Sequence, residues 1–130
     1  MARLLLSLLL AFIFVVPSAR AEEPLVQKVR TSMDKGINYL KTQQKNQGEG
    51  VWNWENDSIA ILQRGGTSCL ALLSLLTAGV PQDDPVIKRC LPYVRQLKPD
   101  HTYVVGLQTM VLAEVGDVRD LDKIQKNVDW

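Results

Sequence analysis

The side chains best suited to chemistry are one serine, one histidine and two cysteines. Ser68 has no histidine close to it in the sequence, so no nucleophilic triad is visible. His101 is the only histidine and follows Pro99-Asp100, which predicts a loop between helices. His101 with the scattered Cys69 and Cys90 lacks the close ligand spacing of a zinc site. We therefore expect no catalytic residue, no metal and no cofactor.

The elements that must carry these side chains are helices. Apolar residues recur at helical spacing over 25–44, which predicts an amphipathic helix, whereas the stretch 67–78 is apolar on all sides and predicts a buried one. Further helices are expected from Asp84-Pro85, over 102–115, and from near Asp120 through Trp130, with no convincing strand. Amphipathic and apolar helices therefore alternate along the chain.

Helix boundaries are marked by local signals. Thr67 is a plausible N-cap after two glycines, and Gly79 followed by Pro81 should end that helix. Asp84 before Pro85 is the pattern of an N-cap followed by a proline at the first helical position. Pro92 lies inside the same helix and should kink it or cost about 3 kcal/mol.

A short pattern recurs three times: a basic residue, any residue, an aliphatic residue, any residue and an aromatic residue. It appears at 35–39, 89–93 and 126–130, and the second step is about 37 residues, in the range of two-helix repeats. The first step is longer, and the loop over 48–66 accounts for the difference. The chain therefore reads as helical-hairpin repeats whose last copy stops inside a helix.

The segment from Lys35 to Trp52 carries a longer pattern: basic, Gly, aromatic, Leu, Gln and then Gly-x-Trp. This resembles the QW repeat of squalene cyclases and related prenyltransferase-like proteins. The second unit has lost the Gln and Gly-x-Trp part, with Tyr103 near where an aromatic residue would sit. The positions that carry the resemblance are Lys35, Gly36, Tyr39, Leu40, Gln44, Gly50 and Trp52.

The resemblance implies an all-α fold in which helical hairpins form part of an α/α toroid. A full ring would need about six hairpins, and this chain supplies about two and a half. The QW residues are then structural: Gln44 should bond backbone groups of a neighbouring helix, and Trp52 should cover that bond.

Catalytic motifs of the related proteins are missing. The cyclases use an Asp-x-Asp-Asp acid, but Gln82-Asp83-Asp84-Pro85 lacks the first aspartate and reads as a helix cap. The segment 117–122 reads as a polar turn and cap. The thioester motif of complement-like toroids is absent from 66–70.

Residues 1–21 have the layout of a cleavable signal peptide: Arg3, an apolar run over 4–16 and the triplet Ala19-Arg20-Ala21. The alternative, a permanent anchor, would need about 20 apolar residues. We expect cleavage after Ala21, a mature domain over 22–130, export to the periplasm or outside the cell, and no membrane span after cleavage.

The mature chain offers few further clues to a partner. The formal net charge is +1 with mixed signs, which does not indicate a nucleic acid. Export is compatible with a disulfide between Cys69 and Cys90, but two buried free thiols are the favoured interpretation. Asn56-Asp57-Ser58 matches a glycosylation sequon, and a chance match is favoured. The apolar loop with Trp52, Trp54 and residues 59–62 is either a recognition loop or folds back on the hairpins.

Three functional hypotheses follow from these patterns. The first is an exported, non-catalytic binding or assembly module whose partner is another protein or an apolar ligand. The alternative is the N-terminal fragment of a cyclase or prenyltransferase-like enzyme whose catalytic residues lie outside this chain. A truncated product with no independent function is the third.

Overall fold

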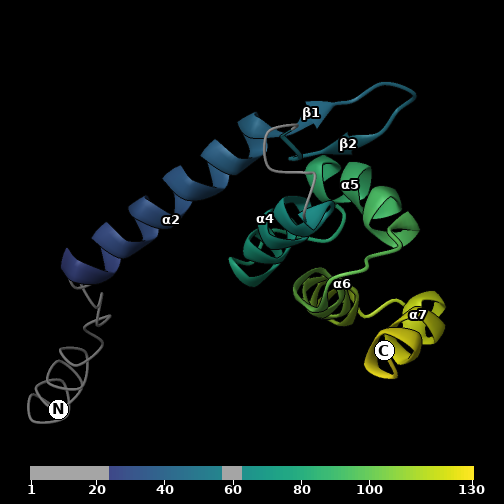
Figure 1. The fold of residues 1–130 in the computed structure, drawn as a ribbon. Helices are drawn as coiled ribbons and strands as arrows, with labels where there is room; N and C mark the ends of the chain where they lie inside the picture. The colour runs from purple at the N-terminus through teal and green to yellow at the C-terminus, as the bar shows by residue number, and fades with distance from the viewer. Residues whose placement is uncertain (1–23, 57–62) are drawn as a thin grey trace, which may run out of the picture. The chain divides into compact units, whose positions relative to one another are not determined.

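The computed structural model describes residues 24–56 and 63–130 (Figure 1). The chain divides into two compact units, Met1–Arg30 and Thr31–Trp130. The predicted signal peptide at 1–21, the loop residues 59–62 and two residues of the sequon, Asp57 and Ser58, lie outside the described residues. The described part is mostly helical, which confirms the all-α prediction. None of its helices is both long and apolar enough to cross a membrane.

The helices begin and end close to the predicted residues. One boundary was wrong: the last helix ends at Val128 and does not run through Trp130, and the Asp129 N–H donates to the Gln125 carbonyl at 3.0 Å. In chain order the elements are α2 (Pro24–Gln43), β1 (Lys45–Asn46), β2 (Trp52–Asn53), α4 (Gly66–Thr77), α5 (Pro85–Gln96), α6 (Thr102–Val115), the 3-10 helix η1 (Val118–Asp120) and α7 (Leu121–Val128).

The expectation of no strand was also wrong. β1 and β2 pair as a minimal antiparallel hairpin in which Lys45 faces Asn53 and Asn46 faces Trp52. Gly48, Glu49 and Gly50 at its tip all have positive φ, at 95, 49 and 77°. Glycine adopts this region freely, whereas Glu49 does so at a conformational cost. Two-residue strands are too short to leave an alternating pattern in the sequence.

The start of α4 is set by Gly65 and not by the predicted cap Thr67. Gly65 is the N-cap residue with φ of 95° and has no side chain of its own to cap the helix. A Cβ at position 65 would lie 2.5 Å from Leu97 Cδ1, so the backbone here packs directly against the end of α5. Close packing therefore requires glycine at the turn, and Thr67 falls inside the first turn of the helix.

The predicted stop after α4 and start of α5 are confirmed. The N–H of Gly79 donates to the Leu76 carbonyl at 2.9 Å and that of Val80 to the Leu75 carbonyl at 3.0 Å, which forms a Schellman motif. The Asp84 carboxylate accepts the Val86 N–H at 2.9 Å and caps α5. α5 continues through Pro92 to Gln96.

The core lies along α4 and α6, which pack side by side (Figure 1). Each contributes buried residues on most sides, whereas α7 and the part of α2 in the second unit contain no buried residue. Ile37 and Leu40 of α2 are half-buried against the core, and Met33 is exposed. Burial thus follows the predicted alternation of apolar and amphipathic helices.

The two cysteines are free thiols in this core, as the favoured interpretation predicted. Cys69 lies on α4 and Cys90 on α5, and both side chains are fully buried. Burial raises the pKa of each thiol to about 12. Because thiolate is the nucleophile and metal ligand, these cysteines are poorly suited to either role.

Candidate functional site

The QW-type residues lie where α2 ends beside the start of α5. Gln44 was expected to bond a neighbouring helix, and its Nε2 donates to the Val86 carbonyl of α5 at 2.9 Å. Lys41 Nζ adds an ion pair with Asp84 Oδ2 at 2.6 Å. The Lys41 ammonium, through its hydrogen bond, holds the pKa of Asp84 below its usual value. These contacts form the first junction of α5, at its N-terminal end.

The other motif residues are spread around this junction. Lys35, Gly36 and Tyr39 are exposed on α2, while Leu40 is half-buried against the core. Gly50 belongs to the hairpin tip. Trp52 on β2 was expected to cover the Gln44 bond, and its ring contacts Arg89 of α5, with the guanidinium carbon 4.2 Å from the ring centroid. The structure therefore brings Gln44 and Trp52 to the same helix, α5, and leaves the first three residues outside the junction.

Trp54 is a structural residue that the motif did not single out. Only 7% of it is exposed, and its Nε1 donates to the Leu40 carbonyl at 2.7 Å. Leu40 is in the last turn of α2, where carbonyls lack helical partners. Trp54 therefore closes the end of α2.

Ser68, for which the sequence showed no nucleophilic triad, is held in a buried hydrogen-bond network. Its Oγ donates to Glu55 Oε1 at 2.6 Å and accepts the Trp54 N–H at 3.0 Å. The Ser68 N–H also donates to Glu55 Oε1, at 3.1 Å. Glu55 thus places its carboxylate at the start of α4, where it complements the helix dipole. The pairing joins residues from a loop and a helix, so sequence spacing gave no signal for it.

Gln108 is a second buried glutamine that makes helix-to-helix bonds, although it lies outside the motif position that the second repeat has lost. This residue of α6 is fully buried. Its Nε2 donates to the carbonyls of Val94 at 2.7 Å and Leu97 at 3.2 Å, and its Oε1 accepts Asn127 Nδ2 at 2.9 Å. One amide therefore joins α5, α6 and α7 at the second junction of α5, its C-terminal end.

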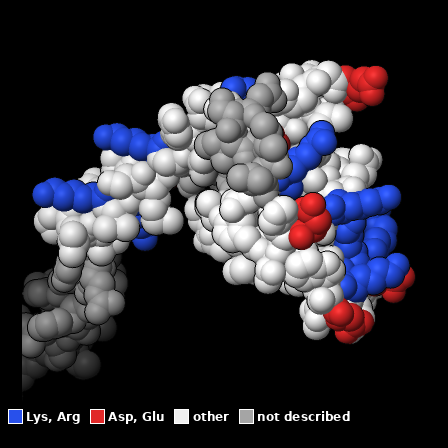
Figure 2. Space-filling model, in the orientation of Figure 1, with Lys and Arg blue, Asp and Glu red and all other residues white. Residues whose placement is uncertain are grey.

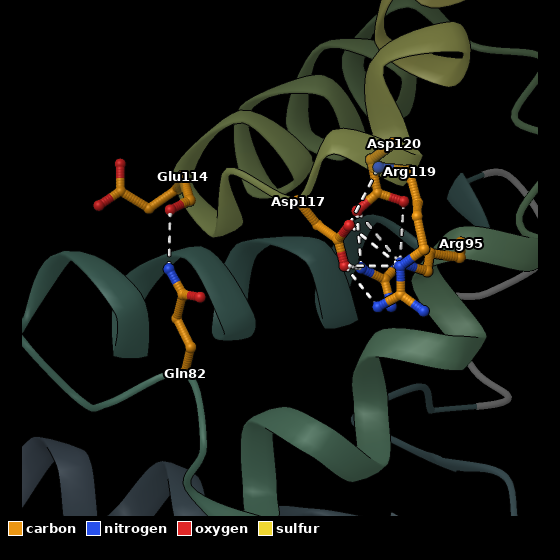
Figure 3. Close-up of polar contacts among 6 residues, drawn as sticks. All are labelled: Gln82, Arg95, Glu114, Asp117, Arg119 and Asp120. Atoms are coloured by element: carbon orange, nitrogen blue, oxygen red, sulfur yellow. Dashed lines mark hydrogen bonds and ion pairs between the residues drawn. The ribbon is translucent and has the colours of Figure 1, made fainter.

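Charged residues reinforce the second junction (Figure 3). Arg95 of α5 donates to both carboxylate oxygens of Asp120, its Nε at 2.9 Å from Oδ1 and its Nη2 at 2.8 Å from Oδ2. Asp117 accepts from Arg95 and from Arg119, and its bond to Arg119 holds its pKa well below the usual range. The hydrogen bond to Asp120 raises the pKa of Arg95. Asp117 also caps η1, so the segment is the predicted polar turn and cap.

His101 lies on the predicted loop and contacts its neighbour Asp100, with Nδ1 2.6 Å from Oδ1. Both side chains are exposed. No group of three or more histidine, cysteine, aspartate or glutamate side chains within residues 24–56 and 63–130 is placed to hold a metal ion.

The strongest candidate for a binding site is an open cleft of about 1090 Å³ that no single sequence motif predicted. It lies between the β1–β2 turn, the start of α4 and the end of α5. Polar and charged side chains dominate the lining, among them Gln47, Glu55, Arg64, Tyr93, Gln96 and Lys98. A cleft of this volume with several polar groups can enclose a ligand and orient it.

Tyr93 lines this cleft and carries a buried hydroxyl beside Arg64. Its hydroxyl is buried and has no hydrogen bond of normal geometry to the residues that the structure describes. Burial, followed by the charge of Glu55, raises the pKa of Tyr93 to about 12, and nearby Arg64 opposes the shift. Tyr93 is therefore a neutral phenol near neutral pH. A buried polar group without a partner costs free energy, which a ligand could offset.

Comparison with known proteins identifies no family for this chain. No protein-family model matches the chain, and neither a curated protein nor a solved structure matches it.

Proposed function

We propose that this chain is an exported helical-hairpin repeat protein of the α/α-toroid type that acts as a non-catalytic binding or assembly module. The buried pair α4 and α6, with α5 packed against α4 and α7 against α6, supports the hairpin-repeat part of the proposal. The QW-type residues support it too, since Gln44 and Trp52 contact the neighbouring helix α5. Repeat proteins commonly use such stacked helices as rigid binding surfaces.

The cleft at the end of α5 carries the binding part of the proposal. Its walls come from three different segments, each fixed by contacts with the core or with another helix. The Tyr93 hydroxyl on these walls is buried without a hydrogen bond of normal geometry to other described residues, and the Gln96 amide is exposed beside it. A rigid cleft lined mainly by polar groups suits a polypeptide segment, because the peptide main chain supplies both donors and acceptors.

Selection from a random peptide library tests this function. The full chain is immobilised, and peptides that it retains are compared with those retained by the Gln96→Arg/Tyr93→Phe variant, which fills and alters the cleft. A binding module should enrich related sequences on the wild-type chain only. Equal recovery from both proteins, or recovery of unrelated sequences, would count against a binding role for the cleft. Circular dichroism of the variant checks that its helices are retained.

A further inference from the structure

Three lysines gather where α5 ends beside α7; we call Lys98, Lys123 and Lys126 the lysine cluster. Lys123 Nζ donates to the carbonyls of Arg95 at 2.7 Å and Leu97 at 2.8 Å, so its position is fixed by the end of α5. Burial first, and then the charges of Lys126 and Lys98, lower the pKa of Lys123. Figure 2 shows basic side chains gathered over the side of the compact unit Thr31–Trp130 that carries α7. Lys98 and Lys126 therefore each lie close enough to repel the ammonium group of Lys123.

Most acidic residues around the lysine cluster are already bonded to other side chains. Asp117 and Asp120 pair with Arg95, and Asp100 contacts His101. Asp129 accepts a hydrogen bond from Gln125. Asp122 is exposed on α7 and forms no ion pair with the cluster. Asp120 partly offsets the charge of Lys123, but Lys98 and Lys126 form no ion pair with a carboxylate of the described residues, so an external anion would relieve the repulsion that they exert on Lys123.

The cleft continues from the lysine cluster, since Lys98 lines both. The amides of Gln47 and Gln96 lie along the cleft, together with the carboxylates of Glu49, Glu55 and Asp100. Those three carboxylates would repel the continuous phosphate charge of a nucleic acid. A polypeptide can instead place acidic side chains on the lysines and uncharged residues in the cleft.

We propose that the lysine cluster and the adjoining cleft bind an acidic segment of a partner polypeptide. The acidic side chains lie on Lys98 and Lys126, and the main chain that follows them bonds to the side-chain amides of the cleft. This inference rests on the proposed binding function and adds the chemistry of the partner. Charge complementarity of this kind speeds association and selects among partners.

Fluorescence polarisation with a labelled peptide tests the inference on the full chain. The probe joins a short oligoglutamate half to a glycine–serine half. We expect Lys98→Gln/Lys126→Gln to weaken binding about tenfold, and we expect added salt to weaken binding to the wild-type chain. Both lysines are exposed, and neither makes a hydrogen bond or ion pair with another described residue, so this variant should fold. Lys123 is left intact because it caps α5.

The matched control is Lys35→Gln/Lys88→Gln, which removes the same charge from exposed positions of α2 and α5 outside the cleft. Equal weakening by both double variants would overturn the inference, because net charge alone would then explain binding. Tighter binding of oligothymidylate, or full displacement of the peptide by millimolar inorganic phosphate, would also overturn it. If the peptide library yields related but non-acidic sequences, the binding function stands and this inference fails.

Discussion

The two ends of α5 are joined to their neighbours in different ways. At the N-terminal junction, Gln44 makes one hydrogen bond to the Val86 carbonyl, and its Oε1 is buried without a partner in the described residues. At the C-terminal junction, Gln108 uses both ends of its amide and contacts two other helices. A glutamine amide therefore bonds through one end at the N-terminal junction and through both ends at the C-terminal junction. The difference teaches that a recognisable motif does not mark the stronger junction.

The largest expected effect comes from Gln108→Leu. The change removes three hydrogen bonds and leaves half-buried Asn127 Nδ2 and the Val94 carbonyl with one partner fewer. Unpaired buried polar groups cost about 1–3 kcal/mol each, so we expect the free energy of unfolding to fall by roughly 3 kcal/mol. Urea denaturation followed by circular dichroism measures it. A loss below about 1 kcal/mol would show that the glutamines stabilise the two junctions to a similar extent.

Arg95→Gln should destabilise the same junction by about 2 kcal/mol. Asp120 is almost fully buried, so removing its partner leaves a carboxylate in a poorly solvated position. The figure is below the usual range for buried pairs because about a quarter of Arg95 is exposed. The matched control is Arg89→Gln on the same helix, which removes a contact with Trp52 and an exposed hydrogen bond to the Pro85 carbonyl and should cost about 0.5 kcal/mol. Equal urea midpoints for the two variants would contradict the prediction.

Gln44→Leu makes the same glutamine-to-leucine change at the N-terminal junction of α5. The leucine loses one hydrogen bond but also removes the unpaired Oε1, so the two effects partly cancel. We expect a loss of less than about 1 kcal/mol, measured by urea denaturation beside Gln108→Leu. If the two leucine variants were equally unstable, the proposed difference between the junctions would be lost.

The smallest effect is a pH dependence at the N-terminal junction. The lowered pKa of Asp84 means that its ion pair with Lys41 stabilises the fold above the unfolded-state pKa of about 4. This stability is lost as the pH falls through the lower folded-state pKa. Asp84→Asn keeps a helix-capping side chain but removes the charge, and should cost less than about 1 kcal/mol at pH 6. The melting temperatures of the wild-type chain and of Asp84→Asn should converge at pH 2. A difference between them that grows toward acidic pH would contradict the assignment.

Sequence patterns predicted the helices well, because each carries a long apolar period or a local stop. The start of α5 followed from Asp84 and Pro85, and the end of α4 followed from Gly79, since both signals act within a few residues. Thr67 failed as a cap because the decisive contact, between Gly65 and Leu97, joins segments that are far apart in the chain. The hairpin strands were missed because they are only two residues long.

The candidate site was less predictable than the fold. Gln44 belonged to a motif, so its role could be anticipated, whereas Gln108 sits in an apolar helix with no local hint of its partners. Its function became visible only when the end of α5 and Asn127 were placed beside it. The cleft likewise depends on Arg64 and Lys98, which come together through folding.

The amide of Gln108 also has a consequence for how the molecule opens. Because one side chain holds α5, α6 and α7, a fluctuation that frees any of them must break bonds to the other two. Backbone amides around this junction should therefore exchange their hydrogens with solvent as one cooperative unit. The end of α2 is held by separate contacts of Lys41, Gln44 and Trp54, none of which joins it to both α6 and α7, so it should open on its own and more often.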